Sequence, residues 1–246
     1  MRRPCTDPHY VTREQLASAL AAPLPGATAQ YQMAPAHRPG PEASNYPPAD
    51  ARRAAVLILF YPDENHTHEN SAGEGGDPRK LSPEGSLLSA SYRIPMMLRP
   101  ARTGPHSGQI SFPGGAYEKN HDRDLRETAL RESEEELGIR PANVEVLGAL
   151  SNLYVAPSGY LVTPYVGWSE RRPEFVLDPR EVDQVLEIPV AHLIDPAHRK
   201  QEIRELKWGL TNVPYFSFPE HETEHKIWGA SAMMLAELLA VLTVLD

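Results

Sequence analysis

Apolar residues gather in a few segments of the chain, and the spacing within each segment predicts a strand or a helix. Residues 52–62, "RRAAVLILFYP", form a short apolar run bounded by arginine and proline, which predicts a buried strand. Further strands are predicted over 89–98, over "GQISF" at 108–112, and within "VEVLGALSNLYV" and "YLVTPYVGW". Strands in mixed runs with few helices indicate an α+β fold or an α/β/α sandwich with a mixed β-sheet.

Helices are predicted near both ends of the chain and at two places between. The pattern is clearest over 122–137, where Gly138 follows as a C-cap. Shorter helical patterns cover 11–22 and 189–194, and a last one covers 228–245. A hairpin of "ELKWGL" and "VPYFSF" is predicted before the final helix.

Two segments have no periodicity and suggest how the chain is divided. The Pro-rich residues after the first helix predict an N-terminal arm over 1–50, followed by a domain over 51–246. Residues 63–86 are polar and Gly-rich and predict a long loop insertion. His66 and His68 lie in this loop without further ligands at metal-binding spacing, so we interpret them as solvated.

Charge and cysteine content narrow the possible functions. A net charge of -9 argues against nucleic acid as the main partner, because phosphate backbones bind clusters of Lys and Arg. Cys5 is the only cysteine, which excludes an internal disulfide and fits a cytoplasmic protein. No apolar run approaches the length of a membrane span, and the first residues resemble an amphipathic helix more than a signal peptide. The sequence leaves open whether the chain forms a homodimer.

The segment "RESEEELG" at 131–138 carries four glutamates within five residues. At 100° per residue, Glu132, Glu135 and Glu136 lie on one face of a helix, whereas Glu134 points away. Three converging carboxylates suit a hard divalent cation, which prefers oxygen ligands. A solvated acidic face is the ordinary alternative. The glycine pair 114–115 at a strand end favours a ligand site, because glycine allows close backbone approach.

The same segment, with the glycines before it, resembles the Nudix box, G-x5-E-x7-R-E-U-x-E-E-x-G-U, in which U is a bulky aliphatic residue. Ser133 stands where the pattern has a bulky residue, and the first acidic position falls on His121. The loop before the helix carries an insertion of two residues, and Asp122 is the candidate to replace the missing glutamate. The positions that match the second half of the box are Arg131, Glu132, Glu135, Glu136, Gly138 and Ile139.

Upstream, "MLRPARTGPHSGQISFPGG" is similar to a segment of the coenzyme A pyrophosphatases within the Nudix hydrolase family. Pro100 replaces a serine of that segment, and Thr103-Gly104 replaces a Leu-Arg pair. The lost arginine removes one expected contact to a substrate phosphate, and Arg102 is close enough in sequence to substitute for it. The likeness extends over about residues 52–245.

This resemblance implies a Nudix fold and metal-dependent hydrolysis of a diphosphate linkage. The expected reaction cleaves coenzyme A or a derivative into 3′,5′-ADP and (acyl-)4′-phosphopantetheine. The cofactor is expected to be Mg²⁺ or Mn²⁺, held by Glu132, Glu135 and Glu136, with Arg131, Glu132 and Glu135 as catalytic residues. The general base is Glu132 or a glutamate of a later loop. The candidate substrate-binding residues are Arg99, Arg102, His106, Gln109, Gly114, Gly115 and Ser158.

Three alternatives remain at this stage. A related hydrolase for ADP-ribose or another nucleoside diphosphate derivative is compatible with the change at Thr103-Gly104. A non-catalytic Nudix-fold binding module is expected to lose glutamates of the box, and all three are present. An acidic interaction helix on a generic domain predicts that Glu132→Gln leaves every activity unchanged.

Overall fold

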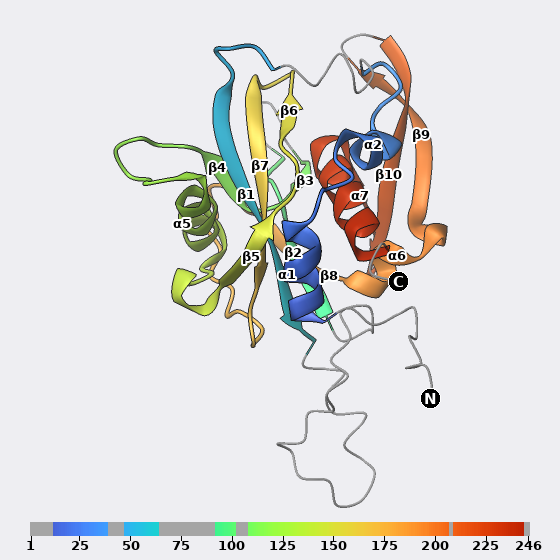
Figure 1. Ribbon diagram of the computed structural model, residues 1–246. Helices are drawn as coiled ribbons and strands as arrows, with labels where there is room; N and C mark the ends of the chain where they lie inside the picture. The colour runs from blue at the N-terminus through green and yellow to red at the C-terminus, as the bar shows by residue number, and fades with distance from the viewer. Residues whose placement is uncertain (1–11, 39–46, 64–91, 102–107, 207–208, 244–246) are drawn as a thin grey trace, which may run out of the picture.

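A computed structural model describes residues 12–38, 47–63, 92–101, 108–206 and 209–243. Within these residues a mixed β-sheet carries α5 (Leu125–Leu137) on one face and α7 (Gly229–Thr243) on the other. A second, three-stranded sheet lies beyond α7 (Figure 1). The predicted α+β class with a mixed sheet is therefore confirmed.

The main sheet is built around β1 (Arg52–Pro62), which pairs in parallel with β7 (Tyr160–Trp168). Its other pairings are antiparallel, so the sheet order β3-β2-β1-β7-β5 contains one parallel step. Two short strands, β4 and β6, pair with β1 and β7, and β8 pairs with β2. The remaining strands are β2 (Tyr92–Leu98), β3 (Ile110–Ser111), β4 (Gly114–Ala116), β5 (Glu145–Ala149), β6 (Leu153–Val155) and β8 (Gln184–Pro189).

Alternate residues of β1 enter two different hydrophobic cores. Ala55 and Leu57 pack with the apolar residues of α5, whereas Ile58 and Phe60 pack with α7. Both faces of β1 are buried, which explains its nearly continuous apolar sequence. The sheet therefore separates the α5 side of the molecule from the α7 side.

The small sheet has the order β11-β10-β9, and all of its pairings are antiparallel. The predicted hairpin is wrong in its placement. The two ends of "ELKWGL" pair with each other, Leu206 with Gly209, whereas "VPYFSF" lies within β10, which also pairs with a third strand, β11. The chain reaches this sheet through a short helix, α6, and a 3-10 turn, η4. These elements are α6 (Val190–Ile194), η4 (Pro196–His198), β9 (Arg199–Leu206), β10 (Gly209–Glu220) and β11 (Thr223–Trp228).

The N-terminal segment packs into the core on the α7 side. It contains α1 (Arg13–Ala21), α2 (Ala27–Gln30) and a 3-10 turn, η1 (Tyr31–Met33). Leu16, Leu20 and Met33 are buried in the same cluster as α7. The proposed division at residue 50 stays a prediction, but the described part of 12–38 is packed rather than extended.

A buried carboxylate fastens this N-terminal segment to α7. Glu237 of α7 is fully buried and accepts hydrogen bonds from Gly26 N–H (3.1 Å), Gln30 Nε2 (2.8 Å) and Ser151 N–H (3.2 Å). Three donors satisfy a charge that would be costly if it were unpaired. Glu237 thereby joins α7, α2 and the β5–β6 connection.

Several predicted boundaries shift in the structure. The acidic helix begins at Leu125 rather than 122, because Asp124 adopts an extended conformation and caps the helix. The strand expected over 108–112 is only two residues long. The loop at 63–86, with His66 and His68, lies outside the described residues apart from its first position. No helix in the described ranges is long and apolar enough to cross a bilayer.

Candidate active site

The acidic segment lies on α5, whose two ends are set by local sequence. The Asp124 side chain accepts a hydrogen bond from Glu127 N–H at 2.9 Å, which caps the first turn. Gly138 ends the helix in the left-handed conformation, with φ of 72°, and its N–H donates to Glu134 O. Leu125 and Ala129 pack on the sheet, and the adjoining side of α5 faces β4.

Glu136 is the most deeply buried glutamate of the segment. Its side chain is 4% exposed, and Oε2 accepts a hydrogen bond from Gly114 N–H at 2.8 Å. Burial raises the pKa of this carboxyl to about 8, against the lowering effects of the Gly114 N–H and of Arg99. Gly114 has a φ of 151°, and a Cβ there would lie 2.6 Å from Val56 Cα, so only glycine fits.

Glu132 occupies the space left by the second glycine. A Cβ on Gly115 would lie 2.5 Å from Glu132 Oε1 and 2.6 Å from Oε2. The Glu132 side chain is 17% exposed, and its partial burial raises its pKa, while the nearby Arg131 opposes that rise. The glycine pair therefore shapes the position of two carboxylates, one for each glycine.

Arg131 connects Glu132 to the loop before the helix. Its Nε donates to Asp122 Oδ1 at 2.8 Å, its Nη2 lies 2.9 Å from Glu132 Oε1, and its Nη1 lies 3.2 Å from Glu135 Oε2. This contact with Arg131 lowers the pKa of the buried Asp122 to about 2. Arg131 thus orients Glu132, and Asp122, the candidate for the missing acidic position, holds Arg131.

The three glutamates of the predicted face differ in their surroundings. Glu136 is enclosed against β4 and Glu132 is half-buried beside it, whereas the Glu135 side chain is 60% exposed. The helical spacing that places the three glutamates on one face does not distinguish these surroundings. The reason is that β4 packs against one side of α5, so that Glu136 faces the strand and Glu135 lies at the rim.

Glu181 also lies at this site, although no pattern in the sequence singled out this residue. The segment before β8 runs along the end of α5, where Asp178 N–H donates to Glu136 O at 3.0 Å. Glu181 lies 3.1 Å from Arg99 Nη2, and its charge raises the pKa of Glu132 and of Glu136. Glu181 lies in a polar loop whose sequence has no periodicity. The one clue to it was the resemblance to the Nudix family, which allows a glutamate of a later loop as general base.

Ser111 gives a further sign that this side of the sheet can hold a ligand. It pairs with Met97 of β2, so its side chain points to the α5 side of the sheet, where Met97 is buried. Among the described residues, its hydroxyl is the buried side-chain polar atom that lacks a hydrogen-bond partner. Such atoms are rare in folded proteins and call for an occupant, such as water or a ligand.

The donor chemistry of this cluster fits a divalent cation. Glu132, Glu135, Glu136 and Glu181 supply oxygen atoms alone, which is the ligand type of Mg²⁺ and Mn²⁺. Two of them have pKa values raised by burial, and a cation would favour their charged forms. In the described part of the chain, however, no three acidic, histidine or cysteine side chains lie close enough to enclose an ion as they stand.

The predicted substrate-binding residues do not all lie at the acidic cluster. Arg99 lies at the cluster, with its Nη1 4.0 Å from Glu136 Oε1, and Gln109 O accepts from the Arg99 N–H. Ser158 lies in the β6–β7 turn, where its hydroxyl donates to Val155 O at 3.1 Å. Arg102 and His106 fall outside the described residues. The binding roles of all these residues stay predictions.

Comparison with known proteins identifies relatives of this chain. The family model of the NUDIX domain matches residues 89–211. The uncharacterized Nudix hydrolase NudL of Yersinia pestis (strain Pestoides F) is 33% identical over 195 residues, covering 79% of this chain and 82% of that protein. Nudix hydrolase 15, mitochondrial, of Arabidopsis thaliana is 28% identical over 192 residues, covering 77% of this chain.

Coverage of the relatives varies. The chain spans 58% of the length of the Arabidopsis protein and 63% of the NudL of Pectobacterium atrosepticum. Among solved structures, a MutT/nudix family protein from Enterococcus faecalis aligns with a TM-score of 0.43 and 11% identity, over 91% of this chain and 71% of that one. The family match covers half of this chain and includes both glycines and the acidic helix. The chain therefore belongs to the Nudix family and has the Nudix fold.

Proposed function

We propose that this protein is a divalent-cation-dependent Nudix diphosphatase that hydrolyses coenzyme A or its derivatives. Water attacks one phosphorus of the P–O–P linkage, and the other phosphate leaves, giving 3′,5′-ADP and (acyl-)4′-phosphopantetheine. The observation that carries the hydrolytic part is the pairing of two desolvated carboxylates with a glycine pair: Gly114 N–H donates to Glu136, and the missing side chain of Gly115 makes room for Glu132. A merely solvated acidic helix would need neither glycine.

Glu132, Glu136 and the rim residue Glu135 would hold Mg²⁺ or Mn²⁺. When bound, such an ion neutralises charge on the diphosphate and lowers the pKa of water. Gly114 N–H fixes the Glu136 carboxylate, and Arg131 fixes that of Glu132. Both carboxylates would therefore be oriented before substrate arrives, which reduces the reorganisation needed in the transition state.

Two glutamates are candidates for the general base. Glu132 is half-buried, and burial raises its pKa towards the range useful for accepting a proton. Glu181 is half exposed and held by Arg99, so it reaches the same cluster from the loop before β8. Arg99 lies between Glu136 and Glu181, where a guanidinium would also meet a substrate phosphate.

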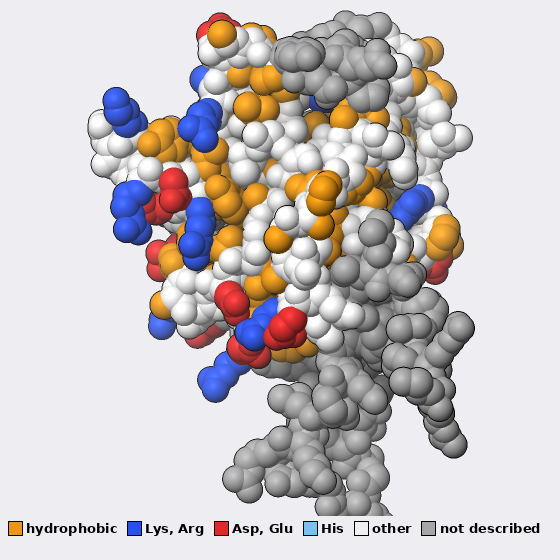
Figure 2. Space-filling view, viewed as in Figure 1, with side chains coloured by type: hydrophobic (Ala, Val, Ile, Leu, Met, Phe, Trp, Pro, Cys, Tyr) orange, Lys and Arg blue, Asp and Glu red, His pale blue; other side chains and the backbone are white. Residues whose placement is uncertain are grey.

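An anionic substrate must approach a protein with a net charge of -9. Figure 2 shows Lys and Arg side chains gathered with acidic ones on the side of the molecule where α5 and β4 lie. Arg53, Lys119, Arg123 and Arg126 are exposed on β1, on the β4–α5 loop and on α5. These basic residues support local attraction of a polyanion despite the overall charge. Specificity for coenzyme A rests on the segment around "GQISFPGG".

The test is turnover of coenzyme A, acyl-coenzyme A, ADP-ribose and NADH, each with Mg²⁺ and with Mn²⁺. We expect 3′,5′-ADP from the coenzyme A species, and no turnover after addition of a chelator. Glu132→Gln and Glu136→Gln should each abolish turnover while the fold is retained. Glu134→Gln is the matched control, since Glu134 is exposed on the same helix.

The substrate and the role of the acidic cluster can be refuted separately. Faster turnover of ADP-ribose than of every coenzyme A species would refute the substrate but leave the reaction class intact. Turnover that persists in both Gln variants, or in the presence of chelator, would refute the role of the acidic cluster. The cytoplasmic location remains part of this proposal and is checked by fractionation of the source cells.

A further inference from the structure

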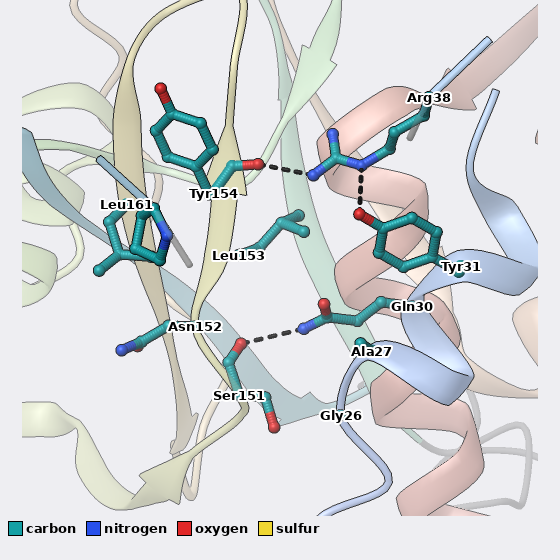
Figure 3. Close-up of a pocket in the computed structure, with 11 residues that line it drawn as sticks. Gly26, Ala27, Gln30, Tyr31, Arg38, Ser151, Asn152, Leu153, Tyr154 and Leu161 are labelled. Atoms are coloured by element: carbon teal, nitrogen blue, oxygen red, sulfur yellow. Dashed lines mark hydrogen bonds between the residues drawn. The ribbon is translucent and has the colours of Figure 1, made fainter. Parts of the chain in front are cut away.

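A cavity of about 420 Å³ lies on the α7 side of the sheet. One wall comes from the N-terminal segment, with Gln30, Tyr31 and Arg38, and the opposite wall comes from β6 and β7 (Figure 3). The volume is in the range of small-molecule sites. The lining residues are Gly26, Ala27, Gln30, Tyr31, Arg38, Pro47, Ser151, Asn152, Leu153, Tyr154 and Leu161.

Arg38 is the charged side chain in this lining, and its guanidinium is held on one edge. Its Nη2 donates to Tyr154 O at 2.6 Å, and its Nε donates to Tyr31 OH at 3.2 Å. Among the described residues, no acidic side chain pairs with it and Nη1 makes no hydrogen bond. The other edge, formed by Nη1 and the second Nη2 hydrogen, is therefore available to an anion in a fixed orientation.

The remaining walls suit an apolar or planar body attached to that anion. The Arg38 guanidinium lies over the Tyr31 ring, 5.3 Å from its centroid, and Leu153 belongs to the hydrophobic core. Gln30 is buried and held by Ser151 O (3.1 Å) and Glu237, so its amide lies in a fixed position at the cavity wall. A guanidinium edge near aromatic and apolar side chains matches a small aromatic or aliphatic phosphate or carboxylate.

This cavity is separate from the acidic cluster. The glycines that meet Glu132 and Glu136 lie on β4, whereas the cavity wall includes β6. β4 pairs with β1 and β6 pairs with β7, so three strand spacings, about 14 Å, separate the two short strands. The cavity also opens among residues of the α7-side core, on the opposite face of the sheet from α5.

We propose that the cavity between α2 and β6 is a second ligand site, which binds a small organic phosphate or carboxylate through the free edge of Arg38. Its ligand is distinct from the diphosphate that the acidic cluster would hydrolyse. The proposal does not depend on the identity of the hydrolysed substrate, because it rests on a different face of the sheet.

The test is calorimetric titration of the full chain with phenyl phosphate, benzoate and the uncharged phenol, in the presence of chelator. We expect saturable one-to-one binding of one or both anions and none of phenol. Arg38→Met and Ala27→Leu should each weaken that binding at least tenfold. The first removes the cation, and the second fills the cavity while Arg38 and its tethers remain.

Arg13→Met is the matched control, because it removes the same charge from an exposed position in the same N-terminal segment. Glu136→Gln is a second control, since it alters the acidic cluster alone. Absence of saturable binding to the unmodified protein at probe concentrations up to about 10 mM would overturn the proposal. So would equal binding to both cavity variants and the Arg13 control, or phenol binding as tight as that of phenyl phosphate.

Discussion

Replacing Glu136 with glutamine tests whether the acidic cluster is destabilising without a cation. The ordinary pKa of a glutamate is 4.5, and burial raises that of Glu136 to about 8. The folded protein therefore holds this proton more tightly than the unfolded chain does. Unfolding releases the proton between these two pH values, so the free energy of unfolding falls as pH rises through the interval.

The magnitude follows from the width of that interval. Each pH unit within the interval lowers the free energy of unfolding by about 1.4 kcal/mol. The total loss is therefore about 3 kcal/mol at pH 7 and about 5 kcal/mol above pH 8. The amide oxygen of a glutamine at this position can still accept the Gly114 N–H, and the amide carries no charge to desolvate. In metal-free buffer, Glu136→Gln should therefore match the unmodified protein near pH 4.5 and exceed it in stability at pH 8 to 9.

The assay is urea denaturation across pH 4.5 to 9 in the presence of chelator, repeated with Mg²⁺. Glu134→Gln is the control, because that side chain is exposed on the same helix. Added Mg²⁺ should raise the stability of the unmodified protein more than that of the Glu136 variant. Parallel pH profiles for the unmodified protein and Glu136→Gln would refute the claim that burial of this carboxyl is costly.

Three further variants test residues that position the acidic cluster or hold the core together. Gly115→Ala should displace the Glu132 carboxylate and lower kcat/KM about 100-fold in steady-state kinetics, since a shift of about 1 Å has an effect of that size; normal kinetics would contradict the steric argument. Asp122→Asn should lower the free energy of unfolding at pH 7 by about 3 kcal/mol, because it leaves Arg131 partly unpaired. In urea denaturation, the difference from the unmodified protein should shrink as pH falls through about 2, where Asp122 itself becomes protonated. Glu237→Leu should lower the free energy of unfolding by about 2–4 kcal/mol, because buried donors lose their acceptor; an unchanged denaturation midpoint would show that water replaces it.

The sequence predicted those elements whose causes are local. The apolar run of β1 and the helix before Gly138 depend on nearby residues, and both are confirmed. The position of Glu181 could not be predicted, because it depends on the pairing of β2 with β8, which brings distant segments together. Single-sequence patterns carry no information on such pairings.

The surroundings of the three glutamates show a similar limit. Helical geometry placed Glu132, Glu135 and Glu136 on one face of the helix. It could not say which side of the face β4 covers, so the burial of Glu136 was missed. The N-terminal segment was underestimated for a related reason: its prolines suggested an arm, while Leu16 and Met33 reach a core formed mostly by distant residues.

The attachment of the N-terminal segment to Glu237 has a consequence for the order of folding during synthesis. The hydrogen bonds between α2 and Glu237 join residues 207 and 211 positions apart. At about 5–20 residues per second, a ribosome needs about 10–40 s to make the intervening chain. Leu16, Leu20 and Met33 must wait that long before α7 exists to bury them. The α5 side of the sheet can assemble first, and the nascent chain is most open to chaperones along the surface that α7 later covers.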